Sequence, residues 1–209
     1  MNILFCSAGR RCELLKDFRK TMGEKGKIVA TDISITAPAL YMADKYYIVP
    51  KINEENYIPT ILDICRKEKI QVVTTLIDPE IMILAENRKK FEDMGIIVLA
   101  PDKKTAEVCF DKYELYKHLK ANGINTTLTY SDLDSFEKGV KNGEIKFPVF
   151  VKPRCGSGSV GARKIENMDT LTKEMEEDPS LIIQEYMLGA IDTDADIYVD
   201  TISKEVVSI

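Results

Sequence analysis

The first half of the chain alternates short apolar runs with amphipathic segments, and this alternation constrains the fold more than any other feature. The apolar runs are typical of β-strands, and the segments between them have the 3.6-residue spacing of helices. The expected strands are Asn2–Cys6, Lys27–Thr31, Tyr46–Val49, Gln71–Leu76 and Gly95–Leu99, and the expected helices are Arg11–Met22, Glu54–Lys67 and Pro79–Phe91. Strands separated by helices predict an α/β domain with a parallel sheet that is covered on both faces.

Three loops follow strands at the edge where such a sheet binds ligands. Cys6–Arg11 leads into a helix N-terminus, where backbone N–H groups and two arginines could hold a carboxylate or a phosphate. Thr31-Asp32 and Ile77–Glu80 close two further strands. The candidate substrate ligands are Ser7, Gly9, Arg10, Arg11, Asp32, Asp78 and Glu80. A simpler alternative is that the aspartates cap turns, with Asp78 capping the helix that Pro79 begins, and that the arginines are solvated.

The rest of the chain predicts a compact α+β unit. The expected helices are Asp111–Ala121, Leu133–Lys141 and Asp169–Glu177, and the expected strands are Asn125–Tyr130, Phe147–Val151, Val160–Ile165 and Leu181–Tyr186. A last strand, Ile191–Asp200, carries acids at 192, 194 and 196, which would share one face. Val206–Ile209 is expected to return beside it. Because an apolar strand then stands at the last residue, we expect an unfinished domain.

A glycine-rich run, KPRCGSGSVGARK (152–164), joins two of these strands. Gly156 and Gly158 allow positive φ and a close approach of backbone N–H groups to an anion. Serine hydroxyls and four basic side chains surround them. The run has neither the order of a Walker A loop nor that of the dinucleotide fingerprint. It predicts a hairpin that closes over a polyphosphate, and the alternative is a flexible surface turn.

Composition narrows the function further. The 209 residues carry a net charge of −5, which argues against a general nucleic-acid surface, so a phosphate site must be local. Apolar runs are too short for a membrane span, and the N-terminus lacks the pattern of a signal peptide. Five cysteines without a CxxC pair fit reduced thiols in the cytosol. Because the chain contains one histidine, His118, a multi-histidine metal site within this chain is excluded.

Taken together, the motifs resemble those of the ATP-grasp superfamily. They are Asp111-Lys112, the VKP–glycine loop, QEYMLGA (Gln184–Ala190) and DTDADIYVD (Asp192–Asp200). The most similar branch is that of the carbamoyl-phosphate synthase large subunit and the pyrrolysine-biosynthesis-type ligases. The resemblance implies a Rossmann-like pre-ATP-grasp domain over residues 1–110, a first ATP-grasp subdomain over 111–187, and a truncated second subdomain over 188–209.

The resemblance also implies roles for particular residues. Lys112 and Lys152 match two lysines that contact the ATP phosphates. The loop residues that would fold over the phosphates are Arg154, Gly156, Ser157, Gly158, Ser159, Val160 and Gly161. Glu185, Tyr186 and Met187 match the segment that meets adenine. Asp192 stands where the family usually has a glutamate near the ribose, and the shorter side chain puts that contact in doubt.

The implied activity is ADP-forming ligation of a small carboxylate to an amine or a thiol, with ATP and Mg²⁺ and through an acyl phosphate. Family members carry their Mg²⁺ ligands after the last hairpin, so none is assigned in this chain. We therefore expect an N-terminal fragment without turnover of its own, and leave a homodimer open. The alternatives are a non-catalytic ATP-binding regulatory module and a Rossmann oxidoreductase or epimerase.

Overall fold

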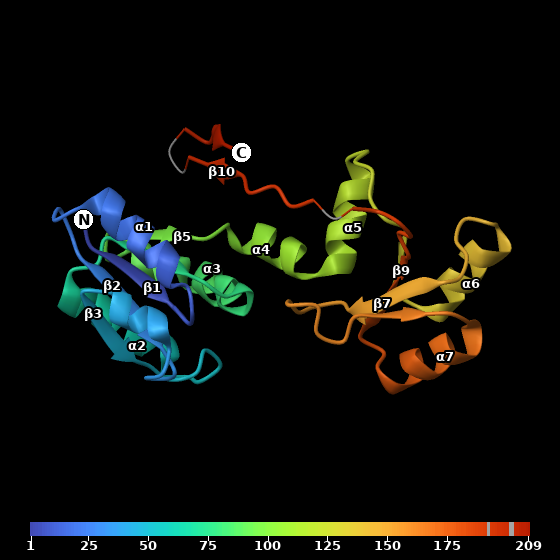
Figure 1. The fold of residues 1–209 in the computed structure, drawn as a ribbon, viewed down its shortest axis with the longest axis horizontal. Helices are drawn as coiled ribbons and strands as arrows, with labels where there is room; N and C mark the ends of the chain where they lie inside the picture. Colours follow the sequence, from blue (N-terminus) through green and yellow to red (C-terminus); the bar gives the residue numbers. More distant parts are fainter. Residues whose placement is uncertain (192, 201–202) are drawn as a thin grey trace.

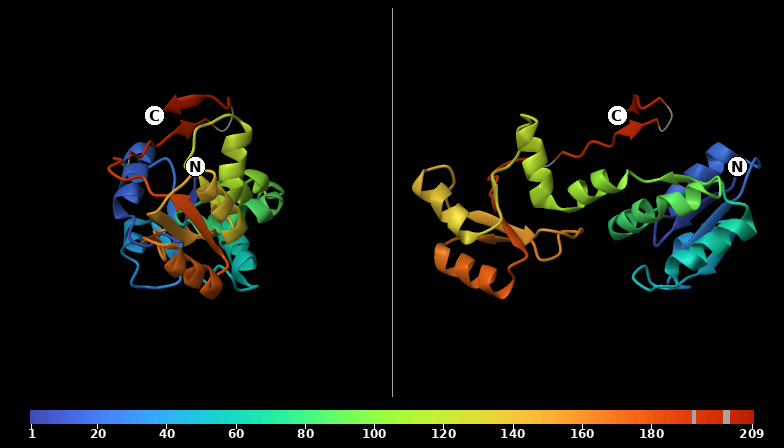
Figure 2. Two further views of the ribbon diagram at one scale, coloured as in Figure 1. Left: turned by 90° about the vertical axis from the view of Figure 1, so that its right-hand side faces the viewer. Right: turned by 180° about the vertical axis from the view of Figure 1, so that it is seen from behind.

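The computed structural model describes residues 1–191, 193–200 and 203–209. Its shape is elongated, with an N-terminal lobe and a C-terminal lobe at opposite ends (Figure 1). Two helices lie between them, α4 (Lys103–Phe110) and α5 (Lys112–Ala121). The views in Figure 2 show the same separation from the side and from behind.

The N-terminal lobe is the expected α/β domain. Its five strands are β1 (Ile3–Cys6), β2 (Ile28–Asp32), β3 (Lys45–Ile48), β4 (Val72–Thr75) and β5 (Ile97–Leu99). They pair in parallel in the order β3-β2-β1-β4-β5. The order reverses between β1 and β4, and ligands of such sheets bind beyond the strand ends at this reversal. The predicted parallel sheet is confirmed.

Side-chain alternation along the strands fills a core on each face of this sheet. Leu4 and Cys6 of β1 face α2 (Tyr57–Glu68) and α3 (Asp78–Glu92). Ile3 and Phe5 face α1 (Cys12–Met22) and a short 3₁₀ helix, η1 (Pro38–Met42), on the other side. Because both faces are covered, the central strands β1 and β2 are apolar along nearly their whole length, whereas the edge strand β3 is mostly exposed.

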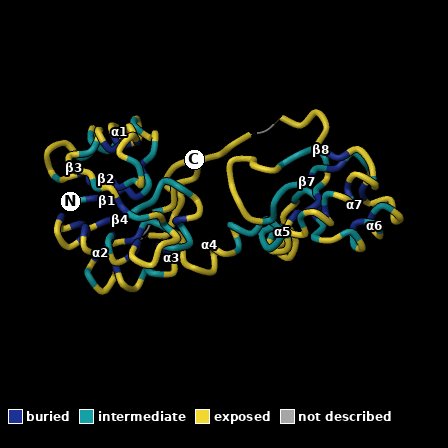
Figure 3. Tube along the Cα trace, turned by 90° about the horizontal axis from the view of Figure 1, so that it is seen from below, coloured by how far each residue is buried: buried dark blue, intermediate teal, exposed yellow. Residues whose placement is uncertain are grey.

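The C-terminal lobe is an antiparallel sheet in the order β6-β9-β7-β8. Its elements are β6 (Thr129–Tyr130), α6 (Leu133–Lys141), β7 (Val149–Pro153), β8 (Arg163–Ile165), α7 (Met168–Glu177) and β9 (Leu181–Glu185). Val149 and Val151 of β7 are fully buried in a core with Phe136 and Leu171. Figure 3 shows buried residues gathered separately in the two lobes. The strand period of two therefore places Phe150 and Lys152 on the opposite, open face of the sheet.

Several expected elements differ from the structure. Within the described part of 191–200, only Tyr198–Val199 (β10) is strand, paired with Val206–Ser208 (β11). The prediction that Asp194 and Asp196 share a strand face is wrong, because residues 193–197 have no partner strand. Asp192 lies outside the described residues. The strand expected over Asn125–Tyr130 is reduced to its last two residues, and the strand expected over Val160–Ile165 to its last three.

Two corrections concern helix ends. Asp78 does not cap α3: it is the first helical residue, the capping position is Ile77, and no side chain caps this end. Pro79 does lie in the first turn, as predicted. Helix α4 was not predicted, although Asp102 accepts a hydrogen bond from the backbone N–H of Thr105 at its start. Its eight residues bury only Ala106, so the apolar period that marks a helix is absent from its sequence.

Candidate phosphate-binding site

The glycine-rich run forms the loop of a β-hairpin, as predicted. β7 and β8 pair antiparallel from Val149 with Ile165 to Val151 with Arg163. The loop between them closes over a cavity of about 210 Å³. The cavity is lined by Lys112, Phe150, Lys152, Pro153, Gly156, Ser157, Gly158, Ser159, Val160 and Ala162. The structure thus brings two lysines from different elements to the same loop.

The loop backbone has the positive φ angles that its glycines allow. Gly158 and Gly161 have φ of 67° and 75°, and Gly156 has φ of 124°. Ser159 has φ of 57°, which a residue with a side chain rarely adopts. Successive turns of this kind present N–H groups to one side and form a concave site for an anion.

Lys112 and Lys152 give this cavity its positive charge. The Lys112 Nζ donates to the carbonyl of Gly156 at 2.7 Å, so its ammonium group is held at the base of the loop. Half-burial lowers the pKa of Lys152, and the charge of Lys112 lowers it further. Within residues 1–191, 193–200 and 203–209 no carboxylate forms an ion pair with either lysine. Two neighbouring cations without a carboxylate favour an anionic ligand.

Arg154, a third predicted phosphate ligand, is already paired. Its Nε lies 2.6 Å from Asp111 Oδ2, and its Nη2 lies 2.9 Å from Glu114 Oε1. Its assignment as a phosphate ligand stays a prediction, and two carboxylates now compete with the phosphate for its charge. Asp111 was not among the predicted site residues. Its position before a helix predicts a capping role, and this is the signal that the sequence offers for it.

The residues predicted to meet adenine lie at the end of β9. Tyr186 packs near Phe150, with ring centroids 6.4 Å apart, and the Lys164 Nζ lies 5.1 Å from the Tyr186 ring centroid. Glu185 and Met187 are exposed beside it. Tyr186 continues the sheet face that carries Phe150 and Lys152, whereas Glu185 pairs with Val149 and so alternates to the other face. Their contact with adenine stays a prediction, and Phe150 is an additional aromatic wall that the sequence reading did not assign.

Four of the seven predicted substrate ligands lie together, and the other three do not. Ser7, Gly9, Arg11 and Asp32 line a cavity of about 550 Å³ with Lys51, Asn53 and three isoleucines, Ile33, Ile52 and Ile77. Asp32 holds this edge together, because its carboxylate accepts from the N–H of Gly9 at 2.8 Å and of Ser34 at 3.0 Å. Arg10 is exposed and is not among the lining residues.

Glu80 lies beneath the sheet edge rather than on it. Its side chain is fully buried and accepts hydrogen bonds from the hydroxyls of Tyr57 and Thr75. Burial raises its pKa to about 7. Direct contact of Glu80 with a substrate stays a prediction. Its side-chain hydrogen bonds are with Tyr57 of α2 and Thr75 of β4.

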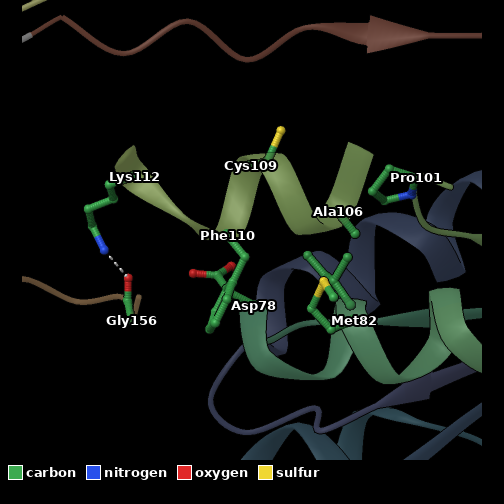
Figure 4. A pocket seen from close by; sticks show the side chains of 9 residues that line it. Asp78, Met82, Pro101, Ala106, Cys109, Phe110, Lys112 and Gly156 are labelled. Carbon is green, nitrogen blue, oxygen red and sulfur yellow. Dashed lines mark hydrogen bonds between the residues drawn. The ribbon is translucent and has the colours of Figure 1, made fainter. Parts of the chain in front are cut away.

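Asp78 lines a cavity of about 220 Å³ that reaches from α3 to the glycine loop. Ile81, Met82, Pro101, Ala106, Cys109 and Phe110 complete its wall, and Lys112 and Gly156 stand at the far side. Figure 4 shows the Asp78 carboxylate and the Lys112–Gly156 hydrogen bond facing this space from opposite sides. Asp78, an expected substrate ligand, and the glycine loop therefore border a common cavity.

Two features are absent from the described residues. Across the described residues, no group of three or more His, Cys, Asp or Glu side chains is placed to bind a metal ion. The same residues contain no helix that is long and apolar enough to cross a membrane.

The fold and this loop are those of the ATP-grasp class, and comparisons with known proteins agree. Residues 3–99 match the family model of the PylC-like N-terminal domain, and residues 109–207 match that of the ATP-grasp domain. The chain belongs to the ATP-grasp superfamily, with a PylC-like N-terminal domain. These matches remove the support for an oxidoreductase.

Individual relatives give the same result. The D-alanine–D-alanine ligase of Bacillus anthracis is 28% identical over 146 residues, which are 62% of this chain and 47% of the ligase. The structure of N5-carboxyaminoimidazole ribonucleotide synthetase from Thermotoga maritima superposes with a TM-score of 0.64 at 23% identity, covering 88% of this chain and 46% of the synthetase.

A third comparison carries bound nucleotide. The biotin carboxylase domain of the Hydrogenobacter thermophilus 2-oxoglutarate carboxylase, solved with MgADP, ADP and bicarbonate, superposes with a TM-score of 0.67 at 21% identity. It covers 90% of this chain and 44% of that protein. The chain therefore spans less than half the length of each of these three proteins.

Proposed function

We propose that the protein is an ADP-forming, ATP-dependent ligase that joins a small carboxylate to an amine, and that this chain supplies its triphosphate site. The observation that carries the proposal is the single cavity lined by Lys112, Lys152 and the glycine loop. Phosphoryl transfer needs positioning and neutralisation of charge more than it needs a protein nucleophile. Lysines and backbone N–H groups supply both.

The residues present fit a triphosphate. Loop N–H groups would take non-bridging oxygens, Lys112 and Lys152 would neutralise their charge, and Tyr186 with Met187 would cover the base. A Mg²⁺ ion, when bound with ATP, would neutralise further phosphate charge. We assign it no ligand here. The loop would also exclude water, which protects an acyl phosphate from hydrolysis.

The carboxylate substrate is assigned to the sheet edge of the N-terminal lobe. Arg11 and Lys51 give the larger cavity positive charge, and the isoleucines give it an apolar wall. In the proposed reaction a substrate carboxylate oxygen attacks the γ-phosphorus and ADP leaves. The amine nitrogen then attacks the acyl carbon and phosphate leaves. The cavity between Asp78 and Gly156 is the route by which the two ligands would meet.

The test measures binding of ATP, tripolyphosphate and adenosine to this chain by calorimetry. We expect ATP and tripolyphosphate to bind and adenosine to bind far more weakly. Adenosine binding as tightly as ATP would overturn the proposal. The ligation step is tested on the whole protein with ATP, a panel of carboxylates and hydroxylamine, which traps an acyl phosphate as a hydroxamate. A protein that binds ATP but forms no hydroxamate with any carboxylate would instead be a regulatory module. Cytosolic location and a homodimer stay predictions.

A further inference from the structure

Arg154 joins two segments that are far apart in the sequence. It directly follows β7, and its guanidinium contacts Asp111, the residue that precedes α5. Its Nε lies 2.8 Å from Oδ1 and 2.6 Å from Oδ2 of Asp111, and its Nη2 lies 2.9 Å from Glu114 Oε1. Its guanidinium carbon also lies 5.4 Å from the ring centroid of Tyr113. The start of α5 is thus fixed to the base of the phosphate loop.

Asp111 serves both partners at once. Its Oδ1 accepts from the backbone N–H of Tyr113 at 3.0 Å and of Glu114 at 3.1 Å, which caps α5. Partial burial raises the pKa of Asp111, but the hydrogen bonds from Glu114 and Arg154 outweigh this effect, so its pKa is lowered overall. The same carboxylate therefore sets where α5 begins and where Arg154 lies.

This arrangement determines the position of Lys112, the first residue of α5. The Lys112 backbone N–H donates to the carbonyl of Arg154 at 3.0 Å, and Asp111 forms an isolated antiparallel bridge with Cys155. The Lys112 Nζ then reaches the carbonyl of Gly156 at 2.7 Å. Backbone and side chain of Lys112 are both tied to the loop that Arg154 begins.

The three basic side chains near the loop differ in whether a carboxylate pairs with them. Arg154 is matched by the two carboxylates of Asp111 and Glu114. Lys112 and Lys152 have no such match among the described side chains, and they line the phosphate cavity. Arg154 does not line that cavity.

We propose that Arg154 and Asp111 form a positioning pair, which holds Lys112 at the phosphate loop, and that Arg154 does not itself bind the nucleotide. This departs from the expectation that Arg154 is a phosphate ligand. The consequence for nucleotide binding rests on the proposed function, but the geometry can be tested without any nucleotide.

The first experiment follows the titration of Lys152 by NMR of its side-chain carbon atoms in the ligand-free chain. The charge of Lys112 lowers the pKa of Lys152, so Lys112→Met should raise that pKa. If the pair positions Lys112, both Arg154→Gln and Asp111→Asn should raise it too. A pure charge effect would act in opposite directions, because one variant removes a positive charge and the other a negative charge. An unchanged or lower Lys152 pKa in Asp111→Asn would overturn the proposal.

Two choices keep this experiment interpretable. Asn at position 111 still offers an oxygen to cap α5, so helix formation is retained. Arg154→Lys keeps the charge but cannot span both carboxylates, and we expect it to behave like Arg154→Gln. Thermal melts confirm that each variant is folded, and Arg19→Gln, which breaks the Arg19–Asp44 ion pair of the N-terminal lobe, is the matched control.

The second experiment measures tripolyphosphate affinity in a double-variant cycle. We expect about a tenfold loss for Arg154→Gln, a similar loss for Asp111→Asn, and no greater loss for the double variant, because all three release the same lysine. Losses that multiply would show that Arg154 binds the phosphates directly and would overturn the proposal. If the unaltered chain does not bind tripolyphosphate, the proposed function fails, and the Lys152 titration still decides the positioning role.

Discussion

Lys112 and Lys152 line the same cavity, although one begins α5 and the other lies near the end of β7. The charge of Lys112 lowers the pKa of Lys152, which burial has already lowered. Holding two ammonium groups together costs free energy in the ligand-free protein. In the proposed function a bound polyanion would remove that cost, so relief of the repulsion would contribute to phosphate affinity.

The first prediction concerns these two lysines. Replacing either one by Met should lower ATP affinity by about tenfold or more, because each removes a charge-assisted contact to phosphate. The thermal stability of Lys152→Met should stay the same or rise, since the repulsion is relieved, whereas Lys112→Met also loses the hydrogen bond to the Gly156 carbonyl. Calorimetry with ATP and a thermal melt measure both effects. Lys141→Met is the control, because Lys141 pairs with Glu137 on the surface of α6. Loss of stability together with affinity in Lys152→Met would contradict the prediction.

The second prediction separates the base from the phosphates. Tyr186→Ala removes an aromatic side chain that packs near Phe150 on the open sheet face. We expect ATP affinity to fall about tenfold, while affinity for tripolyphosphate is unchanged, because only the base loses a packing surface. Parallel titrations with the two ligands test this. An equal loss for both would mean that Tyr186 supports the loop and not the base.

The third prediction distinguishes two glycines of the loop. A Cβ at Gly161 would lie 3.2 Å from Pro153 Cγ and 3.3 Å from Cδ, and its φ is 75°. Gly161→Ala should therefore lower the free energy of unfolding by about 1–2 kcal/mol. A Cβ at Gly158 meets nothing within 4 Å. Because Gly158 has φ of 67°, Gly158→Ala still places a side chain in the left-handed region, so it should lower the free energy of unfolding by about 1 kcal/mol, without the added contact with Pro153, and it should also lower tripolyphosphate affinity. Urea unfolding and calorimetry separate the two outcomes, and identical effects would refute them.

The fourth prediction concerns pH. Burial raises the pKa of Glu80 from 4.5 to about 7 in the folded chain. The folded state therefore binds the proton more tightly than the unfolded state. The stability that this group contributes is complete below pH 4.5 and is lost as the pH rises through 7.

Glu80→Gln should remove this dependence. The fall in the free energy of unfolding between about pH 5 and 8 should shrink by up to about 3 kcal/mol relative to the unaltered chain. Urea unfolding at both pH values measures it. Glu86→Gln, an exposed position on the same helix that pairs with Lys103, should leave the slope unchanged. A slope that is the same with and without Glu80 would show that its carboxyl titrates normally.

The fold could be predicted where the sequence is strongly periodic. The parallel sheet follows from apolar runs such as Ile28–Asp32, which are buried on both faces, and the hairpin follows from Gly156 and Gly158 between two strands. The short helix α4 could not be predicted, because its sequence has no apolar stripe. In the structure it contacts α3 and α5. The strand over 191–200 was predicted from alternation alone, and alternation does not form a strand without a partner to pair with.

The sequence by itself determined the kinds of element and the presence of a loop suited to phosphate, because both depend on residues that are neighbours along the chain. Only the tertiary structure decided which of three basic side chains line the cavity of that loop. Lys112 and Lys152 line its cavity, whereas Arg154 is held by Asp111 and Glu114. Nothing in the order of residues shows that Arg154 is paired with carboxylates, and the motif resemblance assigns all three basic side chains to the phosphates. Their roles depend on which carboxylates lie close in space, and distances of that kind are set by packing.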